Sequence, residues 1–312
     1  MSRFREAVAF APASVGNVAV GFDLLGHALE GAGDRVLARR VSTPGVKVCA
    51  ITGSPMQLPV DVEHNTAARA VQAFIRVHAA DMGIELEIEK GVPLGSGMGG
   101  SAASAVAALV AVNALLPEPL VLEALYEFAL EGEFAASGGH HGDNVAPSLL
   151  GGLVLATHSG CISLPVPDRL TCLLVHPNLV VETRVARARL CEPYPLSAFV
   201  AQSEALALFL CGLHRGDMRL VRAGLKDVLV EPRRADLIPG FAQVQSAMLD
   251  HGALGASISG AGPSVFSWFE TPEAAAIAMP DAVQAFARAG LAATGMLSSV
   301  AAAGARVERC SA

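Results

Sequence analysis

The stretch PLGSGMGGSAASAVAAL, residues 93–109, places four glycines within six positions and then continues into an alanine-rich run with helical character. The segment before it, IELEIEK at residues 84–90, alternates Ile84, Leu86 and Ile88 with three glutamates, which predicts a strand with one solvent-facing side. A strand, a glycine-rich loop and a helix entrance together present free main-chain N–H groups and the positive end of the helix dipole. This arrangement favours phosphate binding, with a purely structural turn as the alternative.

Two common phosphate loops can be compared with this stretch. Gly95, Gly97 and Gly100 have the G-x-G-x-x-G spacing of the dinucleotide fingerprint, which normally follows the first strand of a domain. Here the preceding strand comes late, and Pro93 is out of place in a buried parallel strand. The Walker loop is excluded because the sequence contains neither Gly-Lys-Ser nor Gly-Lys-Thr. Without a lysine in the loop, phosphate would be held by main-chain amides together with a metal ion.

Composition and charge narrow the class of protein. The 312 residues suggest two domains, and a net charge of −7 without long basic runs argues against nucleic-acid binding. The longest apolar run, residues 105–116, is shorter than the roughly 20 residues that span a bilayer, so we expect no membrane partner. The first residues lack an apolar signal core and the six cysteines are scattered, which favours a cytoplasmic protein without a disulfide framework.

The predicted organisation divides after Leu164, where the texture of the sequence changes at PVPDRL. We expect a first domain at residues 1–164 and a second at residues 165–312. In the first domain we predict strands at residues 7–10, 18–22, 35–41, 46–51 and 84–90, and helices at residues 65–82, 101–116 and 119–133. In the second we predict helices at residues 196–213, 240–251 and 272–290, and strands at residues 170–177, around a glycine-rich turn at 260–262, and at the end.

Three sequence blocks together resemble the signatures of the GHMP kinase family. VPLGSGMGGSAAS is similar to the second signature, APASVGNVAVGFDLLGHAL at residues 11–29 to the first, and GASISGAGPSVFSW at residues 255–268 to the third. The blocks occur in the family's order and extend over nearly the whole chain. One departure is Gly100, which stands where the family usually has a serine. We expect its effect to be mild if that serine contributes only its amide.

The resemblance implies both a fold and a chemistry. The fold class is α+β, with a ribosomal-protein-like first domain that binds ATP and a ferredoxin-like second domain. The activity is phosphoryl transfer from ATP, with Mg²⁺, to a small alcohol. Blocks at residues 14–26, 138–152 and 231–241 resemble those of members that phosphorylate the side-chain hydroxyl of L-homoserine on the route to threonine. The alternatives are phosphorylation of another small molecule or a non-catalytic, ligand-binding relative. The resemblance also implies a homodimer, which is usual in the family.

The resemblance also assigns residues to the nucleotide and the metal. Those expected to bind ATP are Asn65, Pro93, Leu94, Gly95, Ser96, Gly97, Met98, Gly99, Gly100, Ser101, Ala102 and Ala103. Ser101 and Glu133 are expected to hold Mg²⁺. The alternatives are helix N-caps for Ser101 and Asn65 and a solvated surface charge for Glu133. Because the helix dipole disfavours a carboxylate near a helix C-terminus, we expect Glu133 to have a compensating partner.

Substrate-binding and catalytic residues follow from the same resemblance. The residues expected to bind the acceptor are Asn17, Asp23, His141, Asn144, Arg187 and Arg234, of which Asn17, Asp23 and Asn144 are also expected to be catalytic. The arginines would hold a carboxylate, with Arg233 as the alternative to Arg234. Asn144 cannot accept a proton, so we expect no dedicated strong base, with Asp23 as the only nearby candidate. A simple turn for Asn17 and a solvated helix position for Arg187 are the alternatives.

Two further motifs each allow more than one interpretation. A zinc site at His140, His141, Glu133 and Asp143 is disfavoured, because adjacent histidines rarely converge on one metal ion. The glycine-rich turn at residues 260–262 is predicted to pack near the phosphate loop, with a purely structural role as the alternative.

Overall fold

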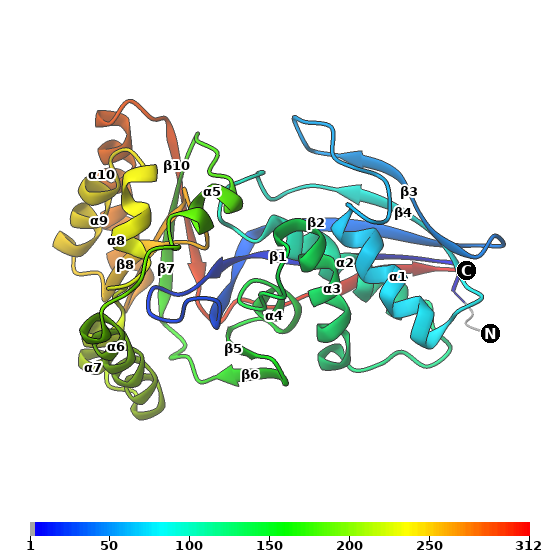
Figure 1. Cartoon of the computed structure of the whole chain (residues 1–312), viewed down its shortest axis with the longest axis horizontal. Coiled ribbons are helices and arrows are strands. Elements are labelled where there is room, and N and C mark those ends of the chain that lie inside the picture. Colours follow the sequence, from blue (N-terminus) through cyan, green and yellow to red (C-terminus); the bar gives the residue numbers. More distant parts are fainter. Residues whose placement is uncertain (1–3) are drawn as a thin grey trace.

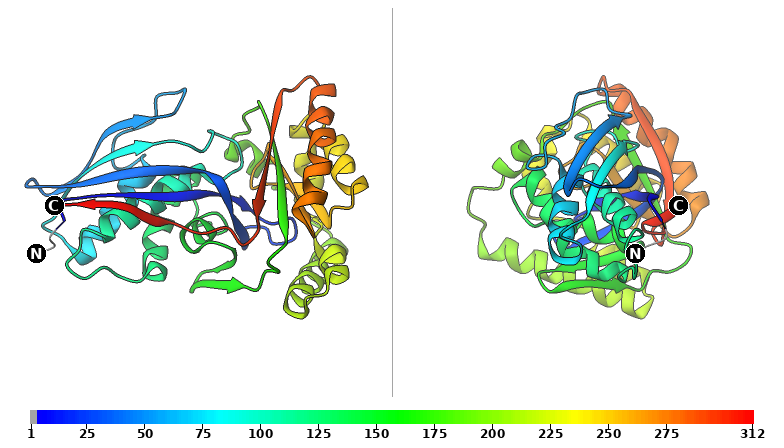
Figure 2. Two further views of the ribbon diagram at one scale, coloured as in Figure 1. Left: turned by 180° about the vertical axis from the view of Figure 1, so that it is seen from behind. Right: turned by 90° about the vertical axis from the view of Figure 1, so that its right-hand side faces the viewer.

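The first part of the chain is built on a seven-stranded sheet. The computed structural model describes residues 4–312, apart from the side chain of Ser137. The strands of this sheet are β1 (Glu6–Gly16), β2 (Leu25–Val41), β3 (Gly45–Thr52), β4 (Gly83–Glu89), β5 (Leu153–Thr157), β6 (Gly160–Leu164) and β11 (Arg306–Ser311). Their order is β11-β1-β2-β4-β3, with β5 paired to β2 and β6 to β5. Strand β11 comes from the far end of the sequence and runs beside β1 (Figures 1 and 2).

Helices cover one face of this sheet (Figure 2). They are α1 (Thr66–His78), α2 (Gly100–Asn113), the short 3-10 helix η1 (Leu122–Leu125), α3 (Tyr126–Ser137) and α4 (Val145–Leu150). Every residue of α2 from Ala102 to Asn113 is buried, as expected for a helix that is apolar on all sides. Its alanines let it lie close between the sheet and α1. The glycine-rich loop before α2 therefore leads directly into a buried helix.

A four-stranded antiparallel sheet organises the second part. Its strands are β7 (Thr171–Pro177), β8 (Gly255–Ile258), β9 (Val265–Phe269) and β10 (Ala293–Ser299). Its helices are α5 (Thr183–Ala188), α6 (Leu196–Arg215), α7 (Met218–Gly224), α8 (Glu231–Arg234), the 3-10 helix η2 (Ala235–Leu237), α9 (Phe241–Asp250) and α10 (Pro272–Arg288). The strand order β10-β7-β9-β8 is that of a ferredoxin-like β-α-β-β-α-β unit, as expected.

The two parts share a buried core. Helices α9 and α10 pack on one side of the second sheet. On its other side Trp268 lies in one apolar cluster with Phe209 of α6, Leu25 of β2 and Met98 of the glycine-rich loop. The loop is consequently covered by both parts of the chain.

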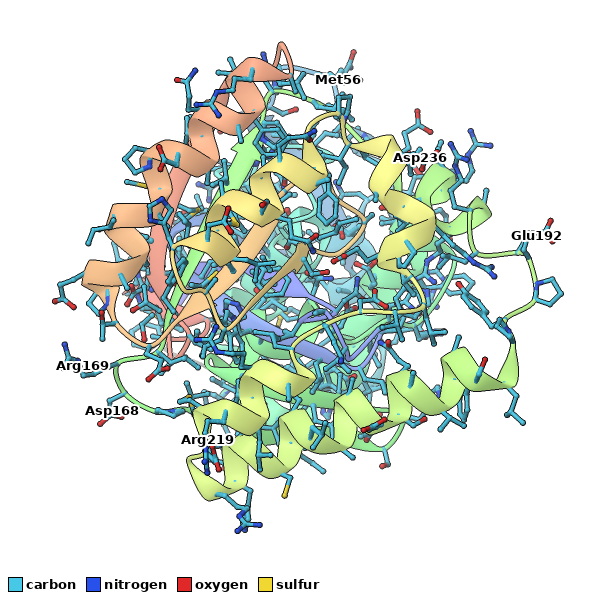
Figure 3. The ribbon with its side chains drawn as sticks, turned by 90° about the vertical axis from the view of Figure 1, so that its left-hand side faces the viewer. Met56, Asp168, Arg169, Glu192, Arg219 and Asp236 are labelled. Atoms are coloured by element: carbon cyan, nitrogen blue, oxygen red, sulfur yellow. The ribbon has the colours of Figure 1, made fainter. Side chains whose placement is uncertain are left out.

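Helix α6 bears on the expectation of no membrane partner. Within residues 4–312 it is the one helix long and apolar enough to cross a membrane by length and composition, a test that core helices of soluble proteins also pass. It packs against α7 along one side of the second part (Figure 3), and its residues Ala205, Phe209 and Leu213 are buried. The apolar run at 105–116, used for the sequence-based expectation, belongs mostly to α2. The expectation itself stays a prediction.

Two sequence-based elements were wrong. Residues 18–22 form a turn rather than a strand, because Asn17, Val18, Ala19 and Asp23 all have positive φ, between 43° and 69°. The helix predicted at 119–133 begins only at Leu122, as η1, and continues as α3 to Ser137. Most of the other predicted elements lie within or overlap observed ones. This correction matters for the site, because the turn contains Asn17 and Asp23, two of the predicted site residues.

Candidate active site

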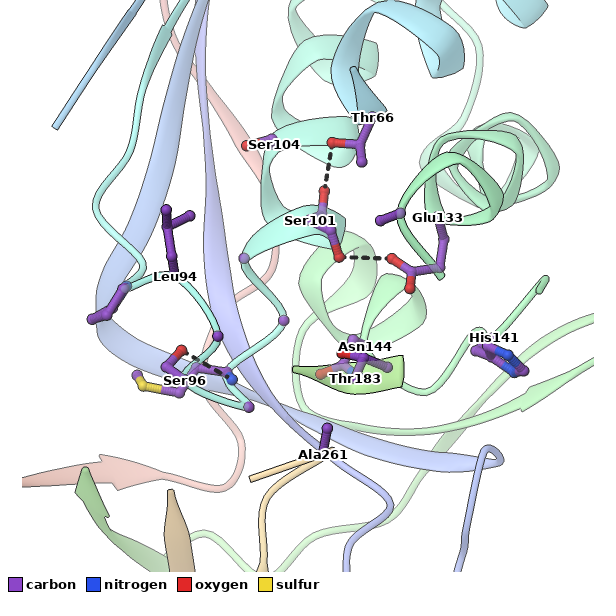
Figure 4. A pocket seen from close by; sticks show the side chains of 18 of the residues that line it. Thr66, Leu94, Ser96, Ser101, Ser104, Glu133, His141, Asn144, Thr183 and Ala261 are labelled. Carbon is purple, nitrogen blue, oxygen red and sulfur yellow. Dashed lines mark hydrogen bonds between the residues drawn. The ribbon is translucent and has the colours of Figure 1, made fainter. Parts of the chain in front are cut away.

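A cavity of about 360 Å³ lies at the junction of the two parts. It is lined by the glycine-rich loop from Pro93 to Ser101, by the turn after β1, and by segments of α1, α3, α5 and α8. Figure 4 shows part of this lining, with Ser96 and Ser101 from the glycine-rich segment and Glu133 from α3. The predicted site residues that it brings together are Asn17, Asp23, Asn65, Glu133, His141, Asn144, Arg187 and Arg234. Of the described residues predicted to bind ATP, Ala102 and Ala103 are buried inside α2 and are not part of the lining.

The loop has the backbone conformation that its glycines suggest. Gly95, Gly97 and Gly99 have φ values of 59°, 75° and 68°, which residues with a side chain rarely adopt. Gly99 is the N-cap residue of α2 and offers no capping side chain. No N-cap side chain therefore satisfies the first N–H groups of α2, and Gly99, Gly100 and Ser101 line the cavity. Such an end can receive an anion.

The third signature packs directly on this loop, as predicted. Ser259 donates its hydroxyl to Gly97 O at 2.7 Å, and Ser264 donates both its hydroxyl and its main-chain N–H to Ser96 O. A Cβ on Gly97 would stand 2.3 Å from the carbonyl oxygen of Ser259. The turn at 260–262 therefore fixes the loop from the second part of the chain.

The side chain of Lys90 contacts the glycine-rich loop at the start of α2. Its ammonium group has three donors, and they contact the carboxylate of Asp34, Gly100 O at 2.7 Å and Ser104 Oγ at 2.8 Å. Asp34 also accepts the main-chain N–H groups of Gly91 and Val92. Both charged side chains are almost fully buried. All three donors of Lys90 are already engaged by Asp34, Gly100 and Ser104, so Lys90 stabilises the start of α2. An anion in the cavity would then be contacted by main-chain N–H groups, as expected for a loop without a lysine.

Ser101 and Glu133 meet at the entrance of α2. The hydroxyl of Ser101 donates to Glu133 Oε2 at 2.8 Å (Figure 4). Ser101 is the second helical residue after Gly99, so the N-cap alternative for it is wrong. The pair supplies two hard oxygen atoms, which suit Mg²⁺. Within residues 4–312 no cluster of three or more His, Cys, Asp or Glu side chains is placed to hold a metal ion, so phosphate oxygens would have to supply further ligands.

Asn65 is both a helix cap and part of the cavity wall. Its Oδ1 accepts the N–H of Ala68 at 3.0 Å, as the N-cap of α1, and its Nδ2 donates to Pro59 O at 2.8 Å. The second contact holds the segment at residues 58–59, which lines the cavity beside the apolar side chains of Ile51 and Ile88. This part of the cavity can receive a flat apolar group.

The turn after β1 presents Asp23 to Arg187 and His141. The main-chain N–H of Asp23 donates to Asn17 Oδ1, while Asn17 Nδ2 donates to Gly260 O at 2.8 Å. Asn17 thus has the structural role in the turn that was given above as its alternative, because its side chain accepts the N–H of Asp23. It also lines the cavity. The Asp23 carboxylate receives both NH groups of Arg187 and lies 3.4 Å from His141 Nδ1.

Arg234 rather than Arg233 faces the cavity. Arg234 is 3% exposed and donates to Ala186 O and Gly260 O, and both it and Arg187 lie near the ring of Phe22. Arg233 instead stacks on Tyr194, 3.6 Å from the ring centre, and donates to carbonyls at residues 192–193. Two guanidinium groups and one carboxylate therefore share one end of the cavity.

The loop at residues 138–144 adds a further carboxylate. His140 contacts Glu131, whereas His141 points to Asp23, so the two histidines have different partners. Asp143 is buried, accepts the N–H of Asn17 at 3.1 Å and contacts the Asn144 amide. Burial, and secondarily the charge of Asp23, raises the pKa of Asp143 to about 7. Burial lowers the pKa of His141 below 6.5.

Sequence reasoning missed Lys90, Asp34 and Asp143 as parts of the site. For Lys90 a signal existed: it continues the buried positions Ile84, Leu86 and Ile88 of the alternating strand, so its charge had to point inward. A buried charge needs a partner, which only the fold could identify. For Asp143 the local sequence carried no comparable signal.

The chain belongs to the GHMP kinase family. The family model for the N-terminal domain of GHMP kinases matches residues 65–152, and that for the C-terminal domain matches residues 209–289. A protein named homoserine kinase from Xanthomonas campestris pv. campestris (strain B100) is 59% identical, over 92% of this chain and 89% of that protein. Another from Xylella fastidiosa (strain 9a5c) is 56% identical, over 91% of this chain and 88% of that protein. The crystal structure of homoserine kinase from Cytophaga hutchinsonii ATCC 33406 has a TM-score of 0.94 and 41% identity, over 98% of both chains.

Proposed function

We propose that this chain transfers the γ-phosphoryl group of ATP to the side-chain hydroxyl of L-homoserine, giving O-phospho-L-homoserine. The observation that carries the proposal is a cavity lined both by the glycine-rich helix entrance and by a carboxylate and two guanidinium groups. A nucleotide needs the first and an amino acid needs the second. The 59% identity to a protein named homoserine kinase supports the choice of acceptor.

On the nucleotide side, the loop from Gly95 to Ser101 would receive the phosphates through main-chain N–H groups. The apolar segment beside Asn65 would receive the base. Mg²⁺, held by Ser101 and Glu133 together with phosphate oxygens, would neutralise charge that develops on the transferred group. Lys90 and the turn at 260–262 keep the loop in place.

On the acceptor side, Asp23 would bind the ammonium group of homoserine, and Arg187 and Arg234 its carboxylate. The hydroxyl would then extend toward Asn144 and the glycine-rich loop. Phosphoryl transfer depends mainly on alignment and charge neutralisation, so Asn144 serves by donating a hydrogen bond rather than by taking a proton.

An acceptor panel tests the proposal. Purified protein is incubated with ATP, Mg²⁺ and one of L-homoserine, mevalonate, galactose or L-threonine, and ADP release is measured. We expect turnover with L-homoserine alone. Turnover with another acceptor would contradict the assignment of the acceptor end, and ATP binding without any turnover would instead support a ligand-binding relative.

Three further statements belong to this proposal. We place the domain boundary after Leu164, where β6 ends before β7 opens the second sheet, with β11 returning to the first sheet. We propose a cytoplasmic location, which cell fractionation tests. We propose a homodimer, for which light scattering on purified protein should give twice the 32.0 kDa of the chain.

A further inference from the structure

The side-chain amide of Asn144 is held at both ends by residues without an assigned role. Ser14, at the end of β1, donates its hydroxyl to Asn144 Oδ1 at 2.9 Å. Asn144 Nδ2 in turn donates to Asp143 Oδ2 at 3.2 Å. Ser14 is fully buried and Asp143 is 4% exposed, so water competes little for either contact.

These partners permit only one orientation of the amide. Asp143 Oδ2 accepts the main-chain N–H of Asn17 and acts as an acceptor toward Asn144 as well, so the amide atom that faces it is nitrogen. The amide oxygen then faces Ser14, whose hydroxyl serves as the donor. Asp143 Oδ2 is held in turn by the N–H of Asn17 at 3.1 Å. Asn144 Nδ2 carries a second hydrogen besides the one donated to Asp143, and Asn144 is one of the residues that line the cavity.

The clamped amide lies against the glycine-rich loop. A Cβ on Gly99 would stand 2.3 Å from Ser14 Oγ and 2.8 Å from Asn144 Oδ1. A Cβ on Gly16 would stand 2.5 Å from Asn144 Nδ2 and from Asp143 Oδ2. The main-chain N–H of Ser14 also donates to Met98 O within the loop. Bare backbone on both sides therefore allows this close approach.

We propose that Ser14 and Asp143 are positioning residues that set the Asn144 amide so that its nitrogen, and not its oxygen, faces the reacting groups. The proposal rests on the proposed function, because it concerns the hydroxyl-to-phosphoryl step. With the amide reversed, the lone pairs of Oδ1 would oppose the oxygens of the transferred group. Since the amide acts where charge is redistributed, loss of its orientation lowers kcat rather than substrate affinity.

A double-mutant cycle tests this assignment. The variants are Ser14→Ala, Asn144→Ala and the pair, with Asp143→Asn in a parallel cycle, all assayed for phosphorylation of L-homoserine. We expect Ser14→Ala to lower kcat about tenfold or more, with KM for ATP and for L-homoserine changed less than about threefold. In the Asn144→Ala background, we expect Ser14→Ala to have no further effect on kcat. Losses that instead multiply in the double variant, or an unchanged kcat for Ser14→Ala, would overturn the proposal.

The chain offers a matched control in Ser148. It is also fully buried and joins α4 to β1, donating to Pro12 O at 2.8 Å, but it does not touch the Asn144 side chain. Ser148→Ala should lower the melting temperature without lowering kcat, and an equal loss of kcat would mean that any buried serine here supports turnover. If Asp143→Asn does not fold, the Ser14 cycle alone decides. Wild-type protein that fails to phosphorylate L-homoserine contradicts the proposed function, whereas active wild type with an active Ser14→Ala contradicts the clamp.

Discussion

The guanidinium group of Arg187 donates to both carboxylate oxygens of Asp23, at 2.8 and 3.2 Å. The two side chains are 31% and 27% exposed, so the ion pair is formed within the cavity rather than on the open surface. Under the proposed function, an amino acid that enters would separate the two charges and would offer a new partner to each, an ammonium group to Asp23 and a carboxylate to Arg187. An acceptor with only one of these charges leaves the other residue unpaired, which is costly. The pair thus favours zwitterionic acceptors.

Asp23→Asn removes the carboxylate from this exchange while keeping its size. We expect KM for L-homoserine to rise about 10- to 100-fold, equivalent to the loss of a charge-assisted hydrogen bond of about 1.5–3 kcal/mol. Steady-state kinetics with varied L-homoserine measures this, and KM for ATP serves as the internal control. A fall confined to kcat would instead assign Asp23 as the base.

Glu133→Gln changes the metal dependence. The carboxylate that pairs with Ser101 loses its charge, so we expect the Mg²⁺ concentration for half-maximal rate to rise by at least about tenfold. A Mg²⁺ titration at saturating ATP measures the shift. Glu131→Gln, two residues earlier in α3, removes contacts to Arg69 and His140 only and should leave the titration unchanged. Equal shifts in both variants would contradict the metal assignment.

Gly97→Ala should damage nucleotide binding. At φ 75° a Cβ would lie 2.3 Å from Ser259 O, a main-chain atom that cannot move freely. We expect at least about tenfold weaker ATP binding by calorimetry, from strain of about 1–2 kcal/mol plus displacement of the loop. Gly138→Ala is the matched control, because φ is 70° there but nothing lies within 4 Å of the added carbon. It should lose some stability and keep its ATP affinity, so weakened ATP binding in that variant would refute the packing argument.

Lys90→Met should destabilise the protein by about 3–5 kcal/mol, because it leaves the Asp34 carboxylate buried without its cation. Urea unfolding measures the change. Lys47→Met, at an exposed position of β3, should change the free energy of unfolding by less than about 0.5 kcal/mol. Similar values for the two variants would mean that Lys90 does not stabilise Asp34.

The raised pKa of Asp143 gives the stability a pH dependence of known sign. Between pH 3.8 and about 7 the folded protein keeps a proton on Asp143 that the unfolded chain releases. Folding therefore loses free energy as pH rises through this window. Asp143→Asn does not titrate, so its unfolding free energy should fall less between pH 4.5 and 7.5 than that of the wild type. Parallel curves in urea unfolding would contradict the shift.

Much of the fold follows from local patterns. The alternation of Ile84, Leu86 and Ile88 predicts β4, and the glycines and alanines after it predict the loop and α2, because those signals reside in neighbouring residues. The turn at residues 17–23 overlaps the strand predicted at residues 18–22, whose apolar residues suit a strand. Its positive φ values accompany main-chain hydrogen bonds that the Asp143 and Asn17 side chains accept. Local propensity gives no account of such contacts.

The amino-acid sequence by itself determined the strand at residues 83–89, the glycine-rich loop with the helix after it, and the family, since each depends on residues close together in the chain. Only the tertiary structure decided that Arg187 pairs with Asp23 across 164 positions, that Arg234 rather than Arg233 faces the cavity, and that Ser14 meets Asn144. The physical reason is that buried polar groups must find partners, and those partners are supplied by packing between distant segments.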